Sequence, residues 1–504
     1  MSGQPAKEKV SADQLLQQAL AASGKGDVDG ALRLFAAAID AAPNNAVIRN
    51  ELGVHYYHRG LIPNARDAFA EAVRLKPDFS RALTNLGACH NELGDNHAAI
   101  ACHERAAAIE PTMVDAWANA GKAWNELEEH EMAIACYRRA LTIATRPDLL
   151  RGLAKAYRKS ARHERSRELL EDAIARKPDD ADAHFGMALT HFHLEDYPAA
   201  LREFEWRMQV KEMVQHRKDL YPIFERPAYS GQDLTGKTLL LHTEQGFGDN
   251  LQFARFIQLV RPRVGRLVMW CRPGLGQLFR QCFDIAEVSE NVFKLPDSDY
   301  QLPLLSVPFH FDPGLASLQA FSPYLFAAED HPLTLATDAS ALNIGLVWGA
   351  SDSGFDHQNK KVPLTALEPL LGIPGTRWFS LQVGSDRDDI APSGLGDRLT
   401  DLGPQLRNFA DTAAALAQLD LVISCDTSVA HLAGAMGKPL WVMLKRNPDW
   451  RWMGDGETTP WYPSARIYRQ TAVGNWPLLI KRIAADLAAA ATSRTLAAKP
   501  RMPP

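Results

Sequence analysis

The chain has no strong excess of charge of either sign, no apolar run long enough to cross a bilayer and no paired cysteines. Its net charge is −5 and its pI about 6.4, so no global basic field points to nucleic acid or to an anionic membrane. The opening MSGQPAKEKVSADQ lacks the apolar segment of a signal peptide, and the six cysteines form no CxxC pair. We therefore expect a reduced, cytoplasmic protein without a transmembrane segment.

Motifs for metal or covalent chemistry are also missing. None of the sixteen histidines belongs to an HExxH pattern, and the chain has neither a cysteine cluster nor an EF-hand loop. The acids of DSD at 297–299 stand in a proline-rich stretch and are interpreted as solvated. No G-x-S-x-G elbow surrounds Ser428, which argues against a serine hydrolase. We therefore expect neither a metal nor a resident cofactor.

The N-terminal part of the sequence is repetitive. Two markers recur with a period of 34 residues: Gly53, Gly87 and Gly121, and Pro43, Pro77 and Pro111. Units such as TNLGACHNELGDNHAAIACHERAAAIEP resemble the tetratricopeptide repeat, a hairpin of two helices. Because one hairpin cannot bury its apolar stripe alone, such units stack into a superhelix. We predict an α-solenoid over 10–205 whose concave face binds a peptide or a partner helix.

Several side chains of these repeats allow two interpretations. Trp117, Trp124, Tyr56 and Tyr57 are interpreted mainly as packing between helices. Asn85, Asn119 and Asn125 fit equally well as solvent-facing residues or as clamps on a peptide backbone.

After a connector over 206–236, short apolar runs alternate with helical stretches, the pattern of βα units with parallel strands. The predicted strands are Thr238–Thr243, Arg266–Cys271, Asn343–Trp348, Trp378–Gln382, Leu419–Ser424 and Leu440–Leu444. We predict two doubly wound lobes, 237–335 and 336–491, which face each other across a cleft. A final helix is expected over 474–491 and a disordered tail over 492–504.

One loop in the first of these lobes stands out. TEQGFGDNLQF follows a strand, and Gly246 and Gly248 permit a tight backbone before a helix expected to open at Asp249. The spacing is not that of a dinucleotide fingerprint. Asp249 either caps the helix or accepts a proton from a bound hydroxyl.

In the second lobe, Lys360 and Lys361 precede Pro363, which we expect in the first turn of a helix, at the carboxyl edge of the sheet. This lysine pair is either solvated or meets a diphosphate. Farther along, SCDTSVAHLAGAMG places Asp426, Thr427, Ser428 and His431 where a strand becomes a helix. These residues either cap the helix or hold a phosphorylated ligand at its positive end.

The segment 447–470, NPDWRWMGDGETTPWYPSARIYRQ, is rich in aromatic residues. Trp450, Trp452, Trp461 and Tyr462 either pack between the lobes or stack on a sugar or base. Arg451 pairs either with a diphosphate or with a neighbouring acid.

Together these segments resemble glycosyltransferase family 9, the heptosyltransferase-like enzymes, in a variant fused to tetratricopeptide repeats. The carrying segments are LLLHTEQGFGDNLQF, IGLVWGAS, NKKVPLTAL, WFSLQ, LDLVISCDTSVAHLAGAMGKPLWVML and DWRWMGDGETTPWYPSARIYRQ. The resemblance implies a GT-B fold of two Rossmann-like lobes. It also implies a nucleotide-sugar donor as co-substrate and metal-independent transfer of a hexosyl or heptosyl group with inversion.

The resemblance also implies roles for the loop residues. Asp249, after Gly246 and Gly248, matches the general base that deprotonates the acceptor hydroxyl. Lys360 matches a lysine that contacts donor phosphate, and Lys361 is its neighbouring candidate. The residues that match the segment around donor sugar and phosphates are Asp426, Thr427, Ser428 and His431. Many relatives have glycine where Ser428 stands.

Two functions follow. In the first, the chain is an active glycosyltransferase whose repeats recruit a protein acceptor, such as a subunit of a surface appendage. In the second, it is a non-catalytic repeat scaffold whose GT-B half binds nucleotide. The presence of Asp249, the lysine pair and the segment from Asp426 to His431 favours the enzyme.

Overall fold

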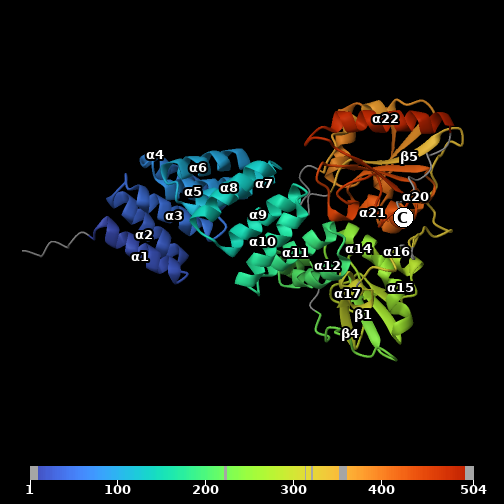
Figure 1. Cartoon of the computed structure of the whole chain (residues 1–504), viewed down its shortest axis with the longest axis horizontal. Coiled ribbons are helices and arrows are strands. Elements are labelled where there is room, and N and C mark those ends of the chain that lie inside the picture. The colour runs from blue at the N-terminus through green and yellow to red at the C-terminus, as the bar shows by residue number, and fades with distance from the viewer. Residues whose placement is uncertain (1–9, 221–223, 313, 319–321, 351–359, 494–504) are drawn as a thin grey trace, which may run out of the picture. The chain divides into compact units, whose positions relative to one another are not determined.

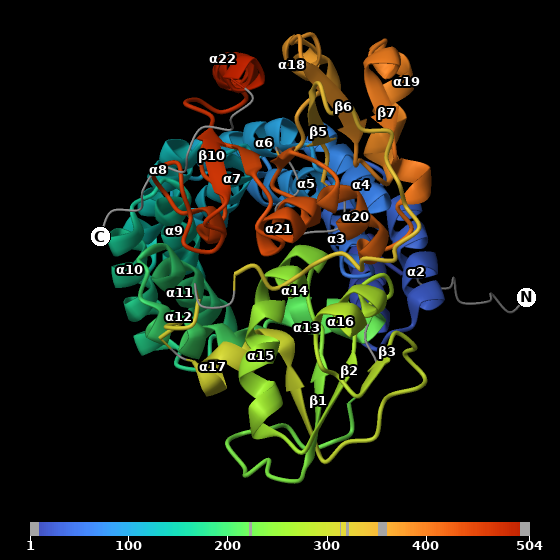
Figure 2. The ribbon, with the colours of Figure 1, turned by 90° about the vertical axis from the view of Figure 1, so that its right-hand side faces the viewer.

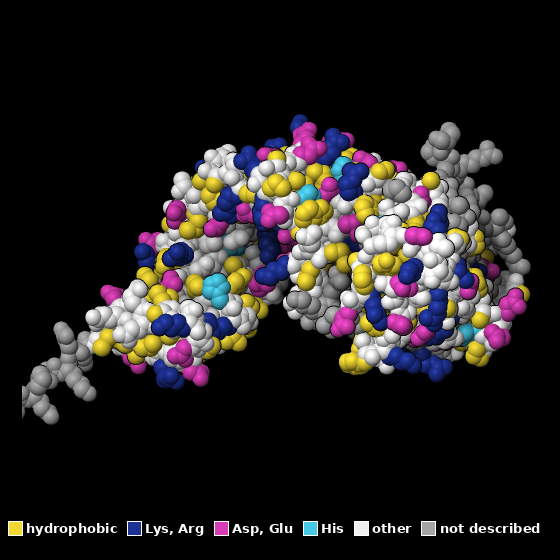
Figure 3. All heavy atoms as spheres, turned by 90° about the horizontal axis from the view of Figure 1, so that it is seen from below, with side chains coloured by type: hydrophobic (Ala, Val, Ile, Leu, Met, Phe, Trp, Pro, Cys, Tyr) yellow, Lys and Arg dark blue, Asp and Glu magenta, His cyan; other side chains and the backbone are white. Residues whose placement is uncertain are grey.

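The computed structural model describes residues 10–220, 224–312, 314–318, 322–350 and 360–493. The chain forms two compact units, Met1–Gly186 and Met187–Pro504. Over the described residues, no helix has both the length and the apolar character needed to cross a bilayer. Figure 3 shows basic and acidic side chains interspersed on the visible face, in keeping with the small net charge.

The first unit is built of helices, each packed against the next along the chain (Figure 1). They are α1 (Ala12–Gly24), α2 (Val28–Ala41), α3 (Ala46–Tyr57), α4 (Ile62–Leu75), α5 (Ser80–Glu92), α6 (Asn96–Ile109), α7 (Val114–Glu126), α8 (His130–Ile143), α9 (Pro147–Lys159) and α10 (His163–Arg176). These helix pairs confirm the predicted repeat array.

The periodic glycines explain how these helices approach each other. A Cβ added at Gly53 would lie 2.6 Å from the Phe69 ring, and one at Gly87 would lie 2.5 Å from the His103 ring. Each glycine stands on the first helix of a hairpin and accepts a ring from the second. The 34-residue marker is therefore a packing position. Trp117 and Trp124 are partly buried against the same kind of core, as expected.

Two of the asparagines left open by the sequence bond inside the array. The side chain of Asn85 donates to Asn50 Oδ1 at 3.0 Å, and Asn50 is buried. Asn125 Oδ1 lies 3.2 Å from His130 Nδ1. Both amides therefore help to join helices.

The second unit begins within α11 (Ala181–His193) and continues through α12 (Tyr197–Phe204) and α13 (Lys211–Leu220) to a parallel sheet. Its strands are β1 (Thr238–His242), β2 (Arg266–Trp270), β3 (Glu287–Ser289) and β4 (Tyr300–Pro303), in the order β3-β2-β1-β4. Helices α14 (Phe247–Phe253), α15 (Ile257–Val260), α16 (Gly276–Cys282) and α17 (Val307–Phe311) accompany it.

A second parallel sheet of the same unit has the order β10-β9-β8-β5-β6-β7. Its strands are β5 (Leu342–Val347), β6 (Thr376–Ser380), β7 (Leu399–Asp401), β8 (Leu421–Cys425), β9 (Leu440–Leu444) and β10 (Ala465–Arg469). The associated helices are α18 (Glu368–Leu371), α19 (Ile390–Ser393), α20 (Phe409–Ala417), α21 (Ser428–Ala435) and α22 (Trp476–Ser493). β8 and β9 are buried throughout, as central strands covered on both faces must be.

Stacked repeat helices followed by two Rossmann-like lobes confirm the predicted fold class. The predicted strands are all present, displaced by no more than a residue or two at an end. β3, β4, β7 and β10 were not predicted: the first three are short, and all four carry polar residues. The predicted connector contains α13. Of the tail predicted to be disordered, residues 494–504 lie outside the described part, while Thr492 and Ser493 complete α22.

Candidate active site

The loop between β1 and α14 carries the first group of candidate residues. The prediction that the helix opens at Asp249 is wrong by two residues, because α14 begins at Phe247 with Gly246 as its N-cap. Asp249 is the third helical residue, and its Oδ2 accepts a hydrogen bond from the Gly246 N–H at 3.0 Å. Gly246 has the extended conformation that an N-cap requires, and an acid three residues later can reach back to it. Asn250 fixes the loop by donating to the carbonyls of Glu244 and Gly246, both at 2.7 Å.

The loop between β8 and α21 carries the second group, and here the helix begins where it was predicted. Thr427 is the N-cap and Ser428 the first helical residue. The Thr427 hydroxyl lies 3.0 Å from the Ser424 hydroxyl and makes no capping bond. The first N–H groups of α21 therefore remain without a side-chain cap, as an anion-binding helix start requires.

Helices α14 and α21 belong to different lobes and pack against each other, as both ribbon views show (Figures 1 and 2). Gly248 is a point of close approach in this contact. A Cβ added there would lie 2.6 Å from His431 Cδ2, so the backbone of α14 rests on the imidazole edge. This contact brings the predicted residues of the two lobes, Asp249 on one and Asp426 to His431 on the other, to one place.

His431 is held on three sides. Its ring stacks on Trp452 with centroids 5.1 Å apart, and its Nδ1 lies 2.9 Å from the Tyr462 hydroxyl. Its Nε2 lies 3.8 Å from Asp426 Oδ1. Burial lowers the pKa of His431 to about 4 despite the attraction of Asp426, so the ring is neutral near pH 7.

Asp426 lies between a cation and an indole. Lys360 Nζ is 2.7 Å from its Oδ2, and Trp452 Nε1 donates to its Oδ1 at 2.7 Å. Burial opposes ionisation, yet the positive charge of Lys360 is the largest influence against it, and the pKa of Asp426 lies below its ordinary value. Asp426 is therefore a carboxylate at neutral pH and holds Lys360 in the cluster.

The structure separates the two candidate lysines. Lys361 forms ion pairs with Asp386 at 2.5 Å and Asp389 at 2.9 Å, and these acids raise its pKa. Lys360 thus shares a site with Asp426, whereas Lys361 belongs to a different acidic pair.

Arg451 joins several groups of the cluster. The sequence left open whether it pairs with a diphosphate or with a neighbouring acid. Its guanidinium forms an ion pair with Asp249 and a second one with Asp449 at 2.7 Å. Its Nε donates to Gln252 Oε1 at 2.7 Å. Of the two pairings considered, the acids are the ones observed, and one of them is the candidate base from the other lobe.

The charges around Asp249 act in opposite directions. Burial has the largest effect and raises its pKa, Arg451 works against that rise, and Asp449 adds to it. The pKa of Asp449 is lowered, because Arg451 and Lys360 outweigh its burial. Asp249 is therefore the more readily protonated of these two acids.

The aromatic residues of this segment support the packing interpretation. Trp450, Trp452, Trp461 and Tyr462 are each no more than 2% exposed. Trp450 stacks on Phe192 of α11 with centroids 4.0 Å apart. The rings therefore pack against Arg451 and His431 and hold both side chains in place.

Asp449 and Gln252 were not predicted as site residues. A usable signal was present for Asp449, because it follows β9, a predicted strand whose carboxyl end lies beside that of β8. Gln252 had no such signal, since its role depends on how the lobes meet.

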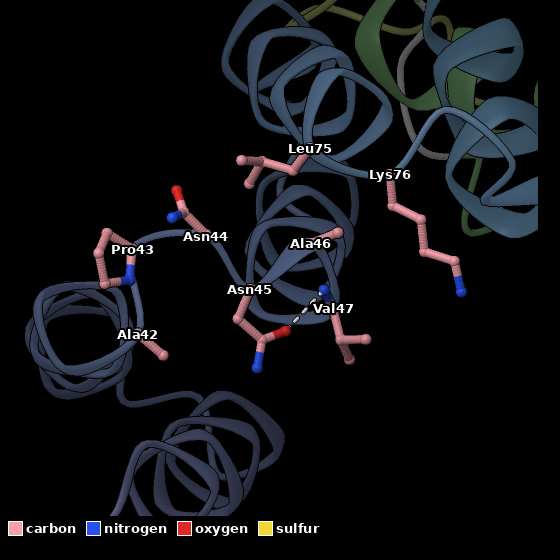
Figure 4. A pocket seen from close by; sticks show the side chains of 8 residues that line it. All are labelled: Ala42, Pro43, Asn44, Asn45, Ala46, Val47, Leu75 and Lys76. Atoms are coloured by element: carbon pink, nitrogen blue, oxygen red, sulfur yellow. Dashed lines mark hydrogen bonds between the residues drawn. The ribbon is translucent and has the colours of Figure 1, made fainter.

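Other features of the described residues do not carry comparable chemistry. No group of three or more His, Cys, Asp or Glu residues in this part of the chain could hold a metal ion. A pocket of the first unit is lined by Ala42, Pro43, Asn44, Asn45, Ala46, Val47, Leu75 and Lys76 (Figure 4). The Asn45 side chain is occupied there in capping α3. A second pocket lies near the amino ends of β5, β6 and β7, away from the strand ends that carry the cluster.

Comparison with known proteins supports the repeat assignment. Tetratricopeptide repeat models match residues 16–79 and 151–206, and residues 80–113 and 114–146. Protein FlbA of Caulobacter vibrioides is 29% identical over 294 residues, which are 53% of this chain and 49% of FlbA. The chain thus spans about half the length of this curated relative.

Some solved structures are similar to part of the chain. The crystal structure of MamA is 24% identical with a TM-score of 0.31, over 34% of this chain and 93% of that one. A tetratricopeptide repeat protein from Parabacteroides merdae is 19% identical with a TM-score of 0.36, over 39% of this chain and 79% of that one.

Proposed function

We propose that the chain is an inverting, metal-independent glycosyltransferase that uses a nucleotide sugar. One observation carries the proposal. A carboxylate on one Rossmann-like lobe, Asp249, stands in the same charged cluster as Lys360 and the start of α21 on the other lobe. The cluster lies where ligands bind in open parallel sheets, beyond the carboxyl ends of the strands. The resemblance to glycosyltransferase family 9 points to the same reaction.

The proposed reaction is a direct displacement. Asp249 takes the proton of the acceptor hydroxyl while the acceptor oxygen attacks the anomeric carbon of the donor. The bond from that carbon to the diphosphate breaks, and the nucleoside diphosphate leaves with the electron pair. Burial raises the pKa of Asp249 and so makes it a stronger base.

The negative charge of the leaving group needs stabilisation on the second lobe. The N–H groups around Thr427 and Ser428 lie at the positive end of α21, and Lys360 adds a full charge beside Asp426. His431 is neutral near pH 7, so its ring is suited to contact the uncharged donor sugar and does not affect the charge of the leaving group. These groups replace a metal in this mechanism.

The acceptor is proposed to be a protein. Tetratricopeptide arrays typically present an extended surface to a peptide or to another protein, and here the array precedes the transfer site on one chain. A protein delivered to the array would raise the local concentration of its hydroxyl groups near Asp249.

One observation favours the alternative, a nucleotide-binding scaffold without transfer. Asp249 is engaged by Arg451 in the structure, so the proposed base is not free. The two functions differ in turnover. Purified protein is incubated with radiolabelled UDP-, GDP-, ADP- and dTDP-sugars, with and without a cell extract as acceptor source. Label in protein or in free sugar that is lost in Asp249→Asn supports the enzyme. Nucleotide binding without any release of label supports the scaffold.

A further inference from the structure

Arg451 is bound to both lobes at once. Its guanidinium pairs with Asp249 of α14 and with Asp449, two residues before it. The Asp449 carboxylate also accepts the backbone N–H of Arg451 at 3.1 Å. Asp449 therefore moves with Arg451, whereas Asp249 comes from the other lobe. Of the two ion pairs, the one to Asp249 is the separable one.

The cations of the cluster already hold carboxylates. In the described contacts, the carboxylates of Asp249, Asp426 and Asp449 pair with the cations Lys360 and Arg451. Lys360 is paired with Asp426, and Arg451 with the two other acids. His431 is neutral near pH 7 and adds no charge. Arg272 faces the same loop, but it donates to the Gln245 carbonyl at 2.9 Å and covers the Phe247 ring.

An entering diphosphate therefore meets cations that already hold carboxylates. To bind one of these cations, the phosphate must compete with that carboxylate. Asp426 is held by Trp452 as well as by Lys360, which makes that pair hard to open. Arg451 keeps Asp449 when it releases Asp249, so its charge stays partly compensated. A guanidinium suits this exchange, because its planar fork fits carboxylate and phosphate oxygens alike.

We propose that Arg451 is a shared counter-ion, which binds Asp249 in the free protein and the donor diphosphate in the loaded one. The inference rests on the proposed function and adds an order of events, in which donor binding comes before release of the base. While Arg451 holds Asp249, the cation weakens the carboxylate as a proton acceptor. Donor entry removes the cation and leaves a buried carboxylate near Asp426 and Asp449, which strengthens it as a base. The base is thus released only when a donor is in place.

Two measurable consequences follow. Asp249 competes with the diphosphate for Arg451, so removing its charge tightens binding of a nucleoside diphosphate. Binding to the intact protein also raises the proton affinity of Asp249, so protons are taken up when the nucleotide binds. A conventional base that touches only the acceptor would produce neither effect.

The test is titration calorimetry with UDP, GDP, ADP and dTDP on wild type, Asp249→Asn, Arg451→Lys and Arg451→Gln. Each titration is run in two buffers of different ionisation enthalpy. Asn at 249 keeps an oxygen for the Gly246 N–H, so the loop stays capped. We expect Asp249→Asn to lower the Kd about fivefold, the scale of one weak ion pair. Arg451→Gln should raise the Kd about ten- to a hundredfold, and Arg451→Lys less.

Proton uptake gives the independent readout. Wild type should take up more protons than Asp249→Asn, and this difference removes the contribution of the nucleotide's own phosphate. Equal Kd values and equal proton uptake in these two proteins would overturn the inference and leave the proposed function standing. If none of the four nucleotides binds wild type, the proposed function fails together with the inference. Arg451→Gln is read only if its circular dichroism matches wild type, and the Asp249→Asn comparison does not depend on it.

Discussion

Gly248 and His431 face each other across the two lobes, and no side chain larger than hydrogen fits between them. An added Cβ would lie 2.6 Å from His431 Cδ2. The imidazole cannot turn aside, because it stacks on Trp452 and bonds to the Tyr462 hydroxyl. The contact between α14 and α21 therefore sets the distance from Asp249 to the donor side of the site.

Gly248→Ala should force the lobes apart. We expect a loss of about 1–3 kcal/mol in the free energy of unfolding, the usual result of overpacking, together with reduced transfer activity. Chemical denaturation and turnover with the active nucleotide sugar measure the two effects. Gly454→Ala is the matched control, because nothing lies within 4 Å of a Cβ added at Gly454. Equal free energies of unfolding for the two variants would mean that the contact between Gly248 and His431 accommodates a methyl group without loss of stability.

Asp249→Asn should remove general-base catalysis. We expect turnover to fall about 10²- to 10⁴-fold, since the amide cannot accept the acceptor proton. Initial rates of nucleotide release at saturating donor measure the change. Asp397→Asn, an exposed acid near the amino edge of the second sheet, should retain wild-type turnover. If Asp249→Asn keeps the wild-type rate, another group takes the proton.

The sequence predicted those features that depend on local patterns. The 34-residue markers predicted the repeats, and Gly53 and Gly87 prove to be positions where a ring fills the space of a missing Cβ. Apolar runs predicted the buried strands, and the pattern at Thr427 and Ser428 predicted the start of α21. The start of α14 was predicted wrongly, because Gly246 is the N-cap and Asp249 occupies the third helical position, N3.

Contacts between the lobes could not be predicted, because they join residues far apart in the sequence. Arg451 and Asp249 are 202 positions apart in the sequence. Asp449 is a sequence neighbour of Arg451, but no local pattern shows that Asp249 is its second partner. Lys360 and Lys361 are adjacent in the chain but bind different acids, Asp426 and Asp386. The sequence therefore identified most participants in the cluster but not how they pair.

The two lysines provide a matched pair of variants. Lys360→Met should weaken nucleoside diphosphate binding about tenfold, because it removes a full charge beside the start of α21. Lys361→Met should change that Kd little, since Lys361 is held by Asp386 and Asp389. Calorimetry on both variants compares them directly. Equal losses would place both lysines on the donor.

Acid should destabilise the second unit through His431. Its pKa is about 4 in the folded protein and about 6.5 when unfolded. Below the unfolded value the unfolded chain binds the proton more readily, so this stability is complete above about pH 6.5 and is lost as the pH falls toward 4. The loss approaches about 3 kcal/mol. Denaturation of wild type and His431→Gln between pH 7 and 4 measures it, and parallel curves would assign the acid sensitivity to other groups.

A buried ion pair connects the end of the repeat helices to the loop that carries Asp249. Arg207, in the short 3-10 helix that follows α12, is 1% exposed and pairs with Glu244, 2% exposed, two residues after β1. It also donates to the Ser306 hydroxyl at 2.6 Å and to Glu205 at 2.7 Å. Burial opposes its charge, but Glu244 and Glu205 outweigh it and raise the pKa of Arg207. Arg207 therefore keeps its positive charge.

Arg207→Met should leave the Glu244 carboxylate buried without its partner and lower the free energy of unfolding by about 3–5 kcal/mol. Removing both charges, as in Arg207→Met with Glu244→Gln, should recover much of that loss, because no uncompensated charge remains. A double-mutant cycle by chemical denaturation measures the coupling. The Glu244 backbone is bonded to Asn250, so the single variant should also lower turnover by displacing Asp249. If the double variant is as unstable as the single one, packing of the Arg207 side chain stabilises this junction and the charge contributes little.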